Sequence, residues 1–384
     1  MHRVVAFASV LALAAAVPVA QAPAPLPPAA PGAPAERVYL RWPHERVDLS
    51  DAERRQLRES VFIINNFGLY QEGQTPDSVY YHDGLDVVLP NGTPIYAIES
   101  GYVRAIAGSP PGRWIVIEDA DQPGWAWQYV HIDDVVPRIG EFVPDGARIA
   151  GVSFRGVEHI HLNRAYIDAG LNNWYDPYSF NFVQSIGLFE FVDTEAPTIK
   201  TPFHYFLNES DDELRDGRPL RVSGEIDIVA AIRDGGEYTG GRIGTLPDFG
   251  HRLAPERVRL SIAAAARPGE TLWEHMSLDF SKVVLKFRRE LPSLRDPDRV
   301  FALFKYRPPL QTSVPLTFDR VFSYYILTNF GNNEPEPRRI DPADGHASWD
   351  TRAFADGEYI VTVEAWDAAG NHAVAQDRVI VANR

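Results

Sequence analysis

Residues 95–131 read IYAIESGYVRAIAGSPPGRWIVIEDADQPGWAWQYVH, and this stretch decides the fold class of the first half of the chain. Four short runs rich in β-branched and aromatic residues alternate with turn signals such as Pro110-Pro111-Gly112 and Pro123-Gly124. The spacing leaves no room for a helix between successive strands, which argues against a βαβ architecture or a TIM barrel. We therefore predict a mainly β protein that begins with a mostly antiparallel sheet.

A second β-rich region follows a polar, proline-containing joint at residues 193–198. Residues 357–381 alternate on both sides of a turn at residues 367–371, as the strands of a closing β-hairpin do. Such an ending is typical of an immunoglobulin-like β-sandwich. Residues 197–384 exceed the roughly 100 residues of one sandwich, so this region has a long insertion or consists of two small domains. We favour one domain with the insertion between about Ala266 and Ala347.

The N-terminus has the pattern of an export signal followed by a tether. A basic start, a short apolar run and the small-x-small sequence Ala20-Gln21-Ala22 predict a cleaved signal peptide over residues 1–22. Residues 23–35 are almost wholly Pro, Ala and Gly, which predicts an extended linker. We expect folded domains over residues 36–192 and 193–384, in an exported protein that is periplasmic or extracellular.

Net charge and cysteine content exclude several classes of function. The 384 residues carry a formal net charge of -15, which repels nucleic acid, because binding to its backbone needs clustered Lys and Arg. The chain has no cysteine, so disulfides, cysteine-type zinc sites and thiolate catalysis are excluded. Any metal in this protein must therefore be held by His and carboxylates.

Four histidines and one aspartate of the first β-rich region have the order expected of a metal site: His82-Asp83-Gly84-Leu85-Asp86, then His131, then His159-Ile160-His161. Residues two apart in a strand share a face, so His159 and His161 can reach one cavity. A straight strand would separate His82 from Asp86 by about 13 Å, so the chain must bend between them. Gly84 permits a bulge or a φ above zero there and clears space for a ligand.

The residue types in this pattern suit hydrolysis assisted by zinc. Two imidazoles and one carboxylate are suitable zinc ligands, and three protein ligands leave a fourth position for water. Zinc lowers the pKa of that water to about 7 and polarises a carbonyl oxygen, and other histidines can move the proton or stabilise an oxyanion. The alternative is a zinc hydratase with a three-histidine site of His131, His159 and His161, like that of a carbonic anhydrase.

Three motifs resemble those of the lysostaphin/LytM-type zinc endopeptidases of bacterial cell walls. They are His-x-Gly-x-Asp at residues 82–86, Tyr-x-His at residues 129–131 and His-x-His at residues 159–161. The resemblance extends over about residues 62–167 and includes supporting segments at Gly92–Ala97, Gly101–Val103 and Asp145–Gly151.

The resemblance implies a role for each of the five residues. His82, Asp86 and His161 would bind one Zn2+ ion, while His131 and His159 would act in catalysis, with the general base left open between them. It also implies a peptidase domain with a LytM-like groove, and the peptides of peptidoglycan as substrate. We expect no nucleic acid partner and, after signal cleavage, no membrane association. A non-catalytic wall-binding or activator protein of the same fold is the alternative, and the presence of all five residues argues against it.

Overall fold

The computed structural model describes most of the chain beyond the N-terminal segment. The described residues are 40–72, 79–154, 158–167, 173–175, 177–181, 193–215, 217, 219–235, 253–281, 283–286, 305, 322–329 and 346–384. The expected signal peptide and linker lie outside these residues. Within them the fold is mainly β with antiparallel sheets, which confirms the predicted fold class. Among the described residues no helix has the length and apolar character needed to cross a membrane.

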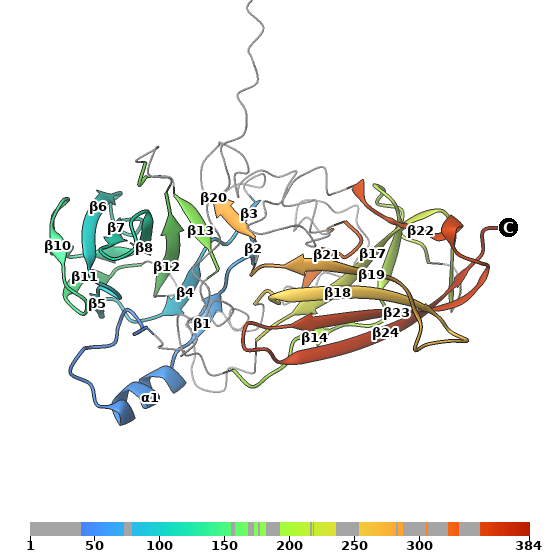
Figure 1. Cartoon of the computed structure of the whole chain (residues 1–384), viewed down its shortest axis with the longest axis horizontal. Helices are drawn as coiled ribbons and strands as arrows, with labels where there is room; N and C mark the ends of the chain where they lie inside the picture. The colour runs from blue at the N-terminus through green and yellow to red at the C-terminus, as the bar shows by residue number, and fades with distance from the viewer. Residues whose placement is uncertain are drawn as a thin grey trace, which may run out of the picture.

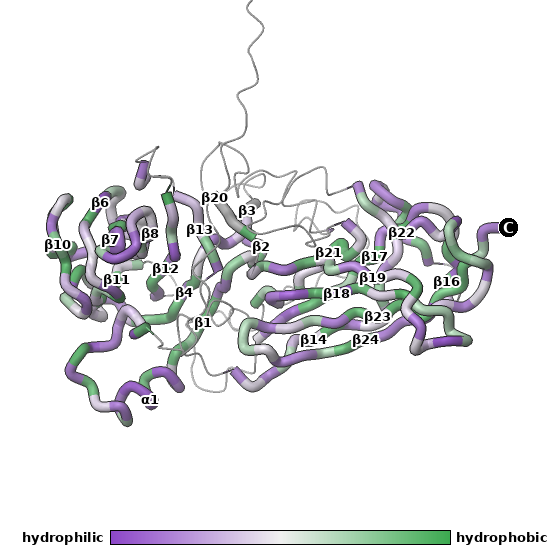
Figure 2. The backbone as a smooth tube through the Cα atoms, viewed as in Figure 1, coloured by the Kyte–Doolittle hydropathy of each residue, from purple (hydrophilic) through white to green (hydrophobic). Residues whose placement is uncertain are grey.

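The only regular α-helix of the described residues is α1 (Asp51–Glu59), which covers no core. It begins at a capping box in which the Ser50 side chain accepts from the Glu53 backbone and the Glu53 side chain accepts from the Ser50 backbone. No residue of α1 is buried, and Figure 2 shows it as largely hydrophilic.

The strands of the first half form a large sheet and a small one that share a core, while β2 and β3 pair as a separate two-stranded sheet. The large sheet has nine strands: seven have the order β1-β4-β12-β8-β7-β6-β10, β13 pairs with β12, and β20 pairs with β13. The small sheet has the order β5-β11-β9, and its apolar side chains pack with those of the large sheet in one hydrophobic cluster. The strands are β1 (Ile63–Asn65), β2 (Tyr70–Glu72), β3 (Val79–Tyr81), β4 (Leu85–Val88), β5 (Pro94–Tyr96), β6 (Gly101–Ala107), β7 (Trp114–Asp119), β8 (Trp125–Val130), β9 (Ile132–Asp133), β10 (Phe142–Val143), β11 (Arg148–Val152), β12 (His159–Tyr166) and β13 (Tyr178–Phe180).

Strand β12 holds the centre of the large sheet because it pairs along both edges. Its N-terminal half pairs with β4 on one edge, while its C-terminal half pairs there with β13. The other edge pairs with β8. This register places His161 opposite Asp86 of β4 and Val130 of β8. The segments that carry all the expected site residues therefore meet around one strand.

The second half contains two sheets that enclose a common core, on the right of Figure 1. One has the order β14-β17-β15, with β21 and β22 also paired to β17, and the other has the order β16-β24-β23-β18-β19. The predicted closing hairpin is present as β23 and β24. The elements are β14 (Thr198–Ile199), β15 (His204–Leu207), β16 (Leu220–Val222), β17 (Glu225–Arg233), β18 (Arg257–Ala264), β19 (Thr271–Asp279), β20 (Val284–Lys286), β21 (Ser323–Ile326), β22 (Trp349–Asp350), the 3-10 helix η2 (Thr351–Ala353), β23 (Gly357–Trp366) and β24 (His372–Val381).

The expected insertion between Ala266 and Ala347 contains strands of the sandwich itself. Strand β19 pairs with β18, and β21 pairs with β17. Strand β20 leaves the sandwich and pairs with β13 at the edge of the first sheet. The segment expected to be an insertion thus contributes strands to both sheets of the second half and to the first sheet, and strands that pair over long sequence distances leave no local signal of their partners.

Packing crosses the expected domain boundary near residue 193. Phe67 and Tyr81 lie in the hydrophobic core of the C-terminal sheets, together with Phe280. The rings of Phe67 and Phe280 meet edge to face with their centroids 6.2 Å apart. Gly68 has φ +83°, and a Cβ there would come within 2.4 Å of the Phe280 ring. The two halves are thus joined through a shared core as well as through the chain.

We predict that Phe280→Ala lowers the free energy of unfolding by about 3 to 5 kcal/mol, because it empties a fully buried ring position between the halves. Leu272→Ala is the matched control, since Leu272 is 45% exposed, and it should change stability by no more than about 0.5 kcal/mol. Denaturant unfolding of both variants measures the difference. Equal midpoints for the two would contradict the shared core.

Candidate metal centre

Three buried side chains converge into a compact triangle of ligand atoms. His82 Nε2 lies 2.9 Å from His161 Nδ1 and 3.1 Å from Asp86 Oδ1, and His161 Nδ1 lies 2.7 Å from Asp86 Oδ1. All three residues are less than a tenth exposed. The ligand atoms of a tetrahedral zinc ion lie roughly 3.3 Å apart, given bonds of about 2.0 Å. The triangle therefore fits a small divalent ion after an expansion of a few tenths of an ångström.

The chain bends between His82 and Asp86, as their spacing requires. Strand β3 ends at Tyr81 and β4 begins at Leu85, so the two ligands stand on either side of a break between strands. Gly84 does not adopt a positive φ. Glycine is needed here because the backbone at this position approaches β12 closely. A Cβ at Gly84 would lie 1.9 Å from Asn163 Oδ1 and 2.4 Å from the Leu162 carbonyl oxygen. Glycine lets this bend lie directly against β12.

Asp83 orients the imidazole of His161. Its Oδ1 lies 3.4 Å from His161 Nε2, and its Oδ2 accepts hydrogen bonds from Asn163 Nδ2 at 3.3 Å and Ser179 Oγ at 3.2 Å. A proton on Nε2 that faces Asp83 leaves the lone pair of Nδ1 directed at the triangle. Sequence reasoning missed this role, although Asp83 directly follows the first histidine of the motif.

Two asparagines of the β1 segment hold the other ligands. Asn65 Nδ2 donates to Asp86 Oδ2 at 2.5 Å, which leaves Oδ1 for the triangle. The backbone oxygen of Asn66 accepts from His82 Nδ1 at 3.0 Å, which turns Nε2 of that ring toward the triangle. Such contacts fix the tautomer and orientation of metal ligands. No sequence signal connects these asparagines to the motif, because the contacts depend on β1 pairing with β4.

The neighbouring groups of the cluster shift the pKa values of Asp86 and His161. Burial alone would raise the pKa of Asp86, but the neighbouring imidazoles of His82, His159 and His161 outweigh it and hold that pKa well below its usual value. Burial lowers the pKa of His161, yet hydrogen bonds to Asp83 and Asp86 prevail and raise it to about 10. Because metal ligands must be deprotonated, a metal that binds here would compete with a proton on His161.

The rings of His131 and His159 lie together beside the triangle. Their ring centroids lie 4.8 Å apart, and the Phe154 ring packs 4.3 Å from each. His131 has φ 64°, a conformation that non-glycine residues seldom adopt and that often marks a functional site. Its Nδ1 donates to the Pro111 carbonyl oxygen at 2.8 Å. Burial, followed by the nearby charges of His159 and His161, lowers the pKa of His131 to about 4.

The alternative three-histidine site receives no support from the geometry. Among the described residues, the groups whose ligand atoms come together do not include a set of His131, His159 and His161. The ring centroids of His131 and His161 are 6.1 Å apart, and His131 Nδ1 is engaged by Pro111. The carboxylate of Asp86 takes the place that a third imidazole would have.

Comparison with known proteins identifies this region. Residues 80–170 match Peptidase family M23. The matched segment contains all five histidine and aspartate residues of the cavity and ends after β12. It spans the part of the chain around the metal centre and does not extend into the C-terminal sandwich. A search of curated proteins gave no match.

Solved structures were also compared. A zinc containing peptidase from Vibrio cholerae is 24% identical, with 33% of this chain and 36% of that chain covered and a TM-score of 0.25. The catalytic domain of lysostaphin from Staphylococcus simulans is 23% identical, with 29% and 86% covered and a TM-score of 0.26. A mutant catalytic domain of the prophage-encoded M23 protein EnpA from Enterococcus faecalis is 23% identical, with 28% and 83% covered and a TM-score of 0.24. The chain spans about a third of the length of the Vibrio cholerae peptidase.

We predict that Asp83→Ala weakens zinc binding about 10- to 100-fold, because His161 loses the group that fixes its ring. Asp83→Asn keeps one acceptor for His161 Nε2 and should retain an intermediate affinity. Competition with a chromophoric chelator measures the zinc affinity of the parent and of both Asp83 variants. Asp121→Asn, at an exposed turn away from the cavity, is the control and should bind like the parent. Unchanged affinity in Asp83→Ala would remove Asp83 from the site.

Proposed function

We propose that this chain is a zinc metalloendopeptidase that hydrolyses amide bonds in the stem or cross-bridge peptides of peptidoglycan. The observation that carries the proposal is the convergence of His82, Asp86 and His161 on one point, beside a cavity with two further histidines. The match of residues 80–170 to Peptidase family M23 supports the reaction class. The motifs resemble those of lysostaphin/LytM-type enzymes, which supports the substrate.

In this proposal the triangle holds the zinc ion through His82 Nε2, Asp86 Oδ1 and His161 Nδ1. When bound, zinc supplies an activated water and polarises the carbonyl of the scissile bond. Asn65, Asn66 and Asp83 keep the three ligands in orientation, and burial excludes bulk water from around them. Preorganised ligands of this kind lower the reorganisation that binding would otherwise require.

His131 is the better candidate for the general base. Its Nδ1 proton is held by the Pro111 carbonyl, so Nε2 carries the lone pair that can accept a proton. The lowered pKa of His131 keeps the ring neutral, which a base requires. His159 Nε2 lies 3.6 Å from Asp86 Oδ2, so its ring stands beside the triangle. An imidazole N–H can donate a hydrogen bond to the oxyanion, so we assign that task to His159.

A wall-binding protein without turnover has no specific observation in its favour. The three ligands, the two further histidines and their hydrogen-bond partners are all in place. We also propose export to the periplasm or the cell wall, which the N-terminal sequence supports. In the same proposal residues 36–192 form the peptidase part, and residues 193–384 form an immunoglobulin-like sandwich that braces it.

The test uses His161→Ala, Asp86→Ala and His131→Ala in the full-length chain. We expect the first two to lose zinc and turnover together, because each removes a corner of the triangle. His131→Ala should retain about one zinc per chain and lose turnover by a factor of about 100 or more, since a general base contributes about 10²- to 10⁴-fold. Metal analysis of each protein and digestion of purified peptidoglycan, with the fragments identified by mass, provide the two measurements.

His372→Ala is the matched control, because His372 lies in the C-terminal hairpin and contacts Glu364. It should keep both zinc and activity. Full turnover in His131→Ala would refute the role of His131 while leaving the metal centre intact. Stoichiometric zinc without release of any peptidoglycan fragment by the parent protein would overturn the proposed substrate.

A further inference from the structure

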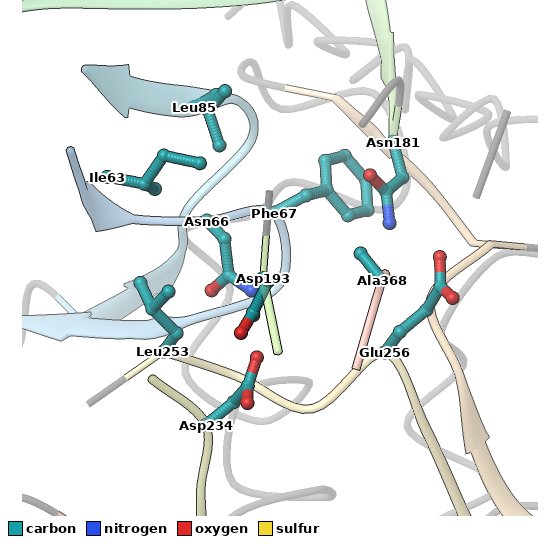
Figure 3. Close-up of a pocket in the computed structure, with 10 residues that line it drawn as sticks. All are labelled: Ile63, Asn66, Phe67, Leu85, Asn181, Asp193, Asp234, Leu253, Glu256 and Ala368. Atoms are coloured by element: carbon teal, nitrogen blue, oxygen red, sulfur yellow. The ribbon is translucent and has the colours of Figure 1, made fainter. Parts of the chain in front are cut away.

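A second group of acidic side chains lies where the two halves of the protein meet. Asp193 is in the joint, Asp234 directly follows β17, and Asp367 directly follows β23. Each offers one carboxylate oxygen, and these oxygens all lie within 4.8 Å of one another. Figure 3 shows the carboxylates of Asp193 and Asp234 pointing toward each other in a pocket that is also lined by residues of the β1 segment.

Asp234 provides an independent sign that this pocket holds a ligand. The residue is 4% exposed, and its Oδ1 is buried without a hydrogen-bond partner. Its backbone is fixed, because its N–H donates to the Leu253 carbonyl at 2.8 Å and its own carbonyl accepts from Leu253 at 2.9 Å. A buried carboxylate oxygen with no donor is costly, and its position between two other carboxylates makes a cation the natural partner.

Hydrogen bonds also fix the positions of the other two aspartates, Asp367 and Asp193. Asp367 Oδ1 accepts from the Asn371 backbone and Oδ2 accepts from the Asn371 side chain, both at 2.8 Å. The same Asn371 amide donates to the Asp193 carbonyl oxygen at 3.1 Å, which ties the turn after β23 to the joint. Asp193 Oδ1 accepts from the Glu195 backbone at 3.0 Å.

Within the described part of the chain, no cationic side chain forms an ion pair with the three carboxylates. Among the ion pairs formed by the described residues, none includes Asp193, Asp234 or Asp367. Like charges at this separation in a partly buried site repel each other strongly, because the surrounding protein screens them less than water does. The cluster therefore needs a positive charge that the described part of the chain does not supply.

We propose that Asp193, Asp234 and Asp367 form a second metal site that binds a hard divalent cation, Ca2+. The site offers only oxygen ligands, which suit Ca2+ and not an ion that prefers nitrogen. Calcium binds oxygens at about 2.3 to 2.6 Å, so ligand oxygens on opposite sides of the ion lie about 5 Å apart. The three carboxylate oxygens lie within 4.8 Å of one another, a spread that a calcium ion can bridge, whereas the histidine triangle has sides of about 3 Å and contains nitrogen.

A cation at this position would brace the wall of the histidine cavity. Leu253, which is bridged to Asp234, precedes Ala254. The Asn66 side chain bonds the Ala254 backbone in both directions, at 2.8 and 2.9 Å, and the Asn66 carbonyl accepts from His82 Nδ1. A short chain of contacts therefore connects the acidic site to His82. The ion would fix the joint, the end of β17 and the turn after β23 relative to one another.

The test is calorimetric titration of the full-length chain, freed of metal and then loaded with zinc, with CaCl2 at neutral pH. We expect one Ca2+ per chain. Asp234→Asn and Asp367→Asn should weaken this binding at least tenfold, while Asp121→Asn should leave it unchanged. His161→Ala should also bind Ca2+ like the parent, because this substitution removes a ligand of the histidine triangle and leaves the three aspartates unchanged. A parallel titration with MgCl2 distinguishes the two hard cations.

Thermal unfolding gives a second measurement. It distinguishes Ca2+ binding by the three aspartates from a role of these residues in packing alone. Calcium at about 100 times its Kd should raise the Tm of the parent by roughly 2 to 5 °C and leave the Tm of Asp234→Asn unchanged. In EDTA, Asp234→Asn should unfold at the same or a higher temperature than the parent, because the substitution removes repulsion and keeps the shape of the side chain. This result also shows that the variant is folded.

Three outcomes would overturn the site. They are the absence of Ca2+ binding by the parent, equal Ca2+ binding by the parent and both aspartate variants, and binding of Mg2+ in preference to Ca2+. None of these measurements uses peptidoglycan turnover, so the acidic site stands or falls independently of the proposed peptidase activity.

Discussion

The pairing register between β12 and β4 is the constraint on which the candidate metal centre depends. It sets His161 opposite Asp86, and from there the turn before β4 brings His82 to the same point. A slip of one residue would move the side chains of β12 to the opposite face of the sheet. Gly84 protects this register, because only a residue without a Cβ lets the bend approach Leu162 and Asn163 so closely. Backbone pairing and side-chain chemistry are therefore fixed by the same few residues.

The sequence predicted the parts of the site that follow from spacing along one segment. His159 and His161 share a face because strands have a period of two, and the distance from His82 to Asp86 demanded a bend. The contacts of Asp83 with His161 and of Asn65 with Asp86 were not predictable, since they arise only after β1, β4 and β12 are paired. Local patterns identify which side chains have suitable chemistry. The sheet topology decides which of them meet.

The same distinction between local patterns and long-range pairing explains which strands of the C-terminal half could be predicted. The hairpin of β23 and β24 was predicted because its alternation and turn are adjacent in sequence. The partners of β19, β20 and β21 were missed, and β20 even pairs with β13 of the first sheet. Such pairings depend on contacts far apart in sequence, where strand propensity carries no information about the partner. The shared core around Phe280 shows that the two halves are not independent units joined by a free linker.

Two clusters with different ligand chemistry lie near the β1 segment. The first combines imidazoles with one carboxylate, which suits a small ion that activates water, and the second has only carboxylates, which suit a larger ion that holds segments together. Asn66 contacts both neighbourhoods, through its backbone to His82 and through its side chain to Ala254. The orientation of a metal ligand therefore depends on how the sandwich is seated. A peptidase part and a sandwich coupled in this way would behave as one structural unit, in which the joint has a direct effect on the geometry of the histidine cavity.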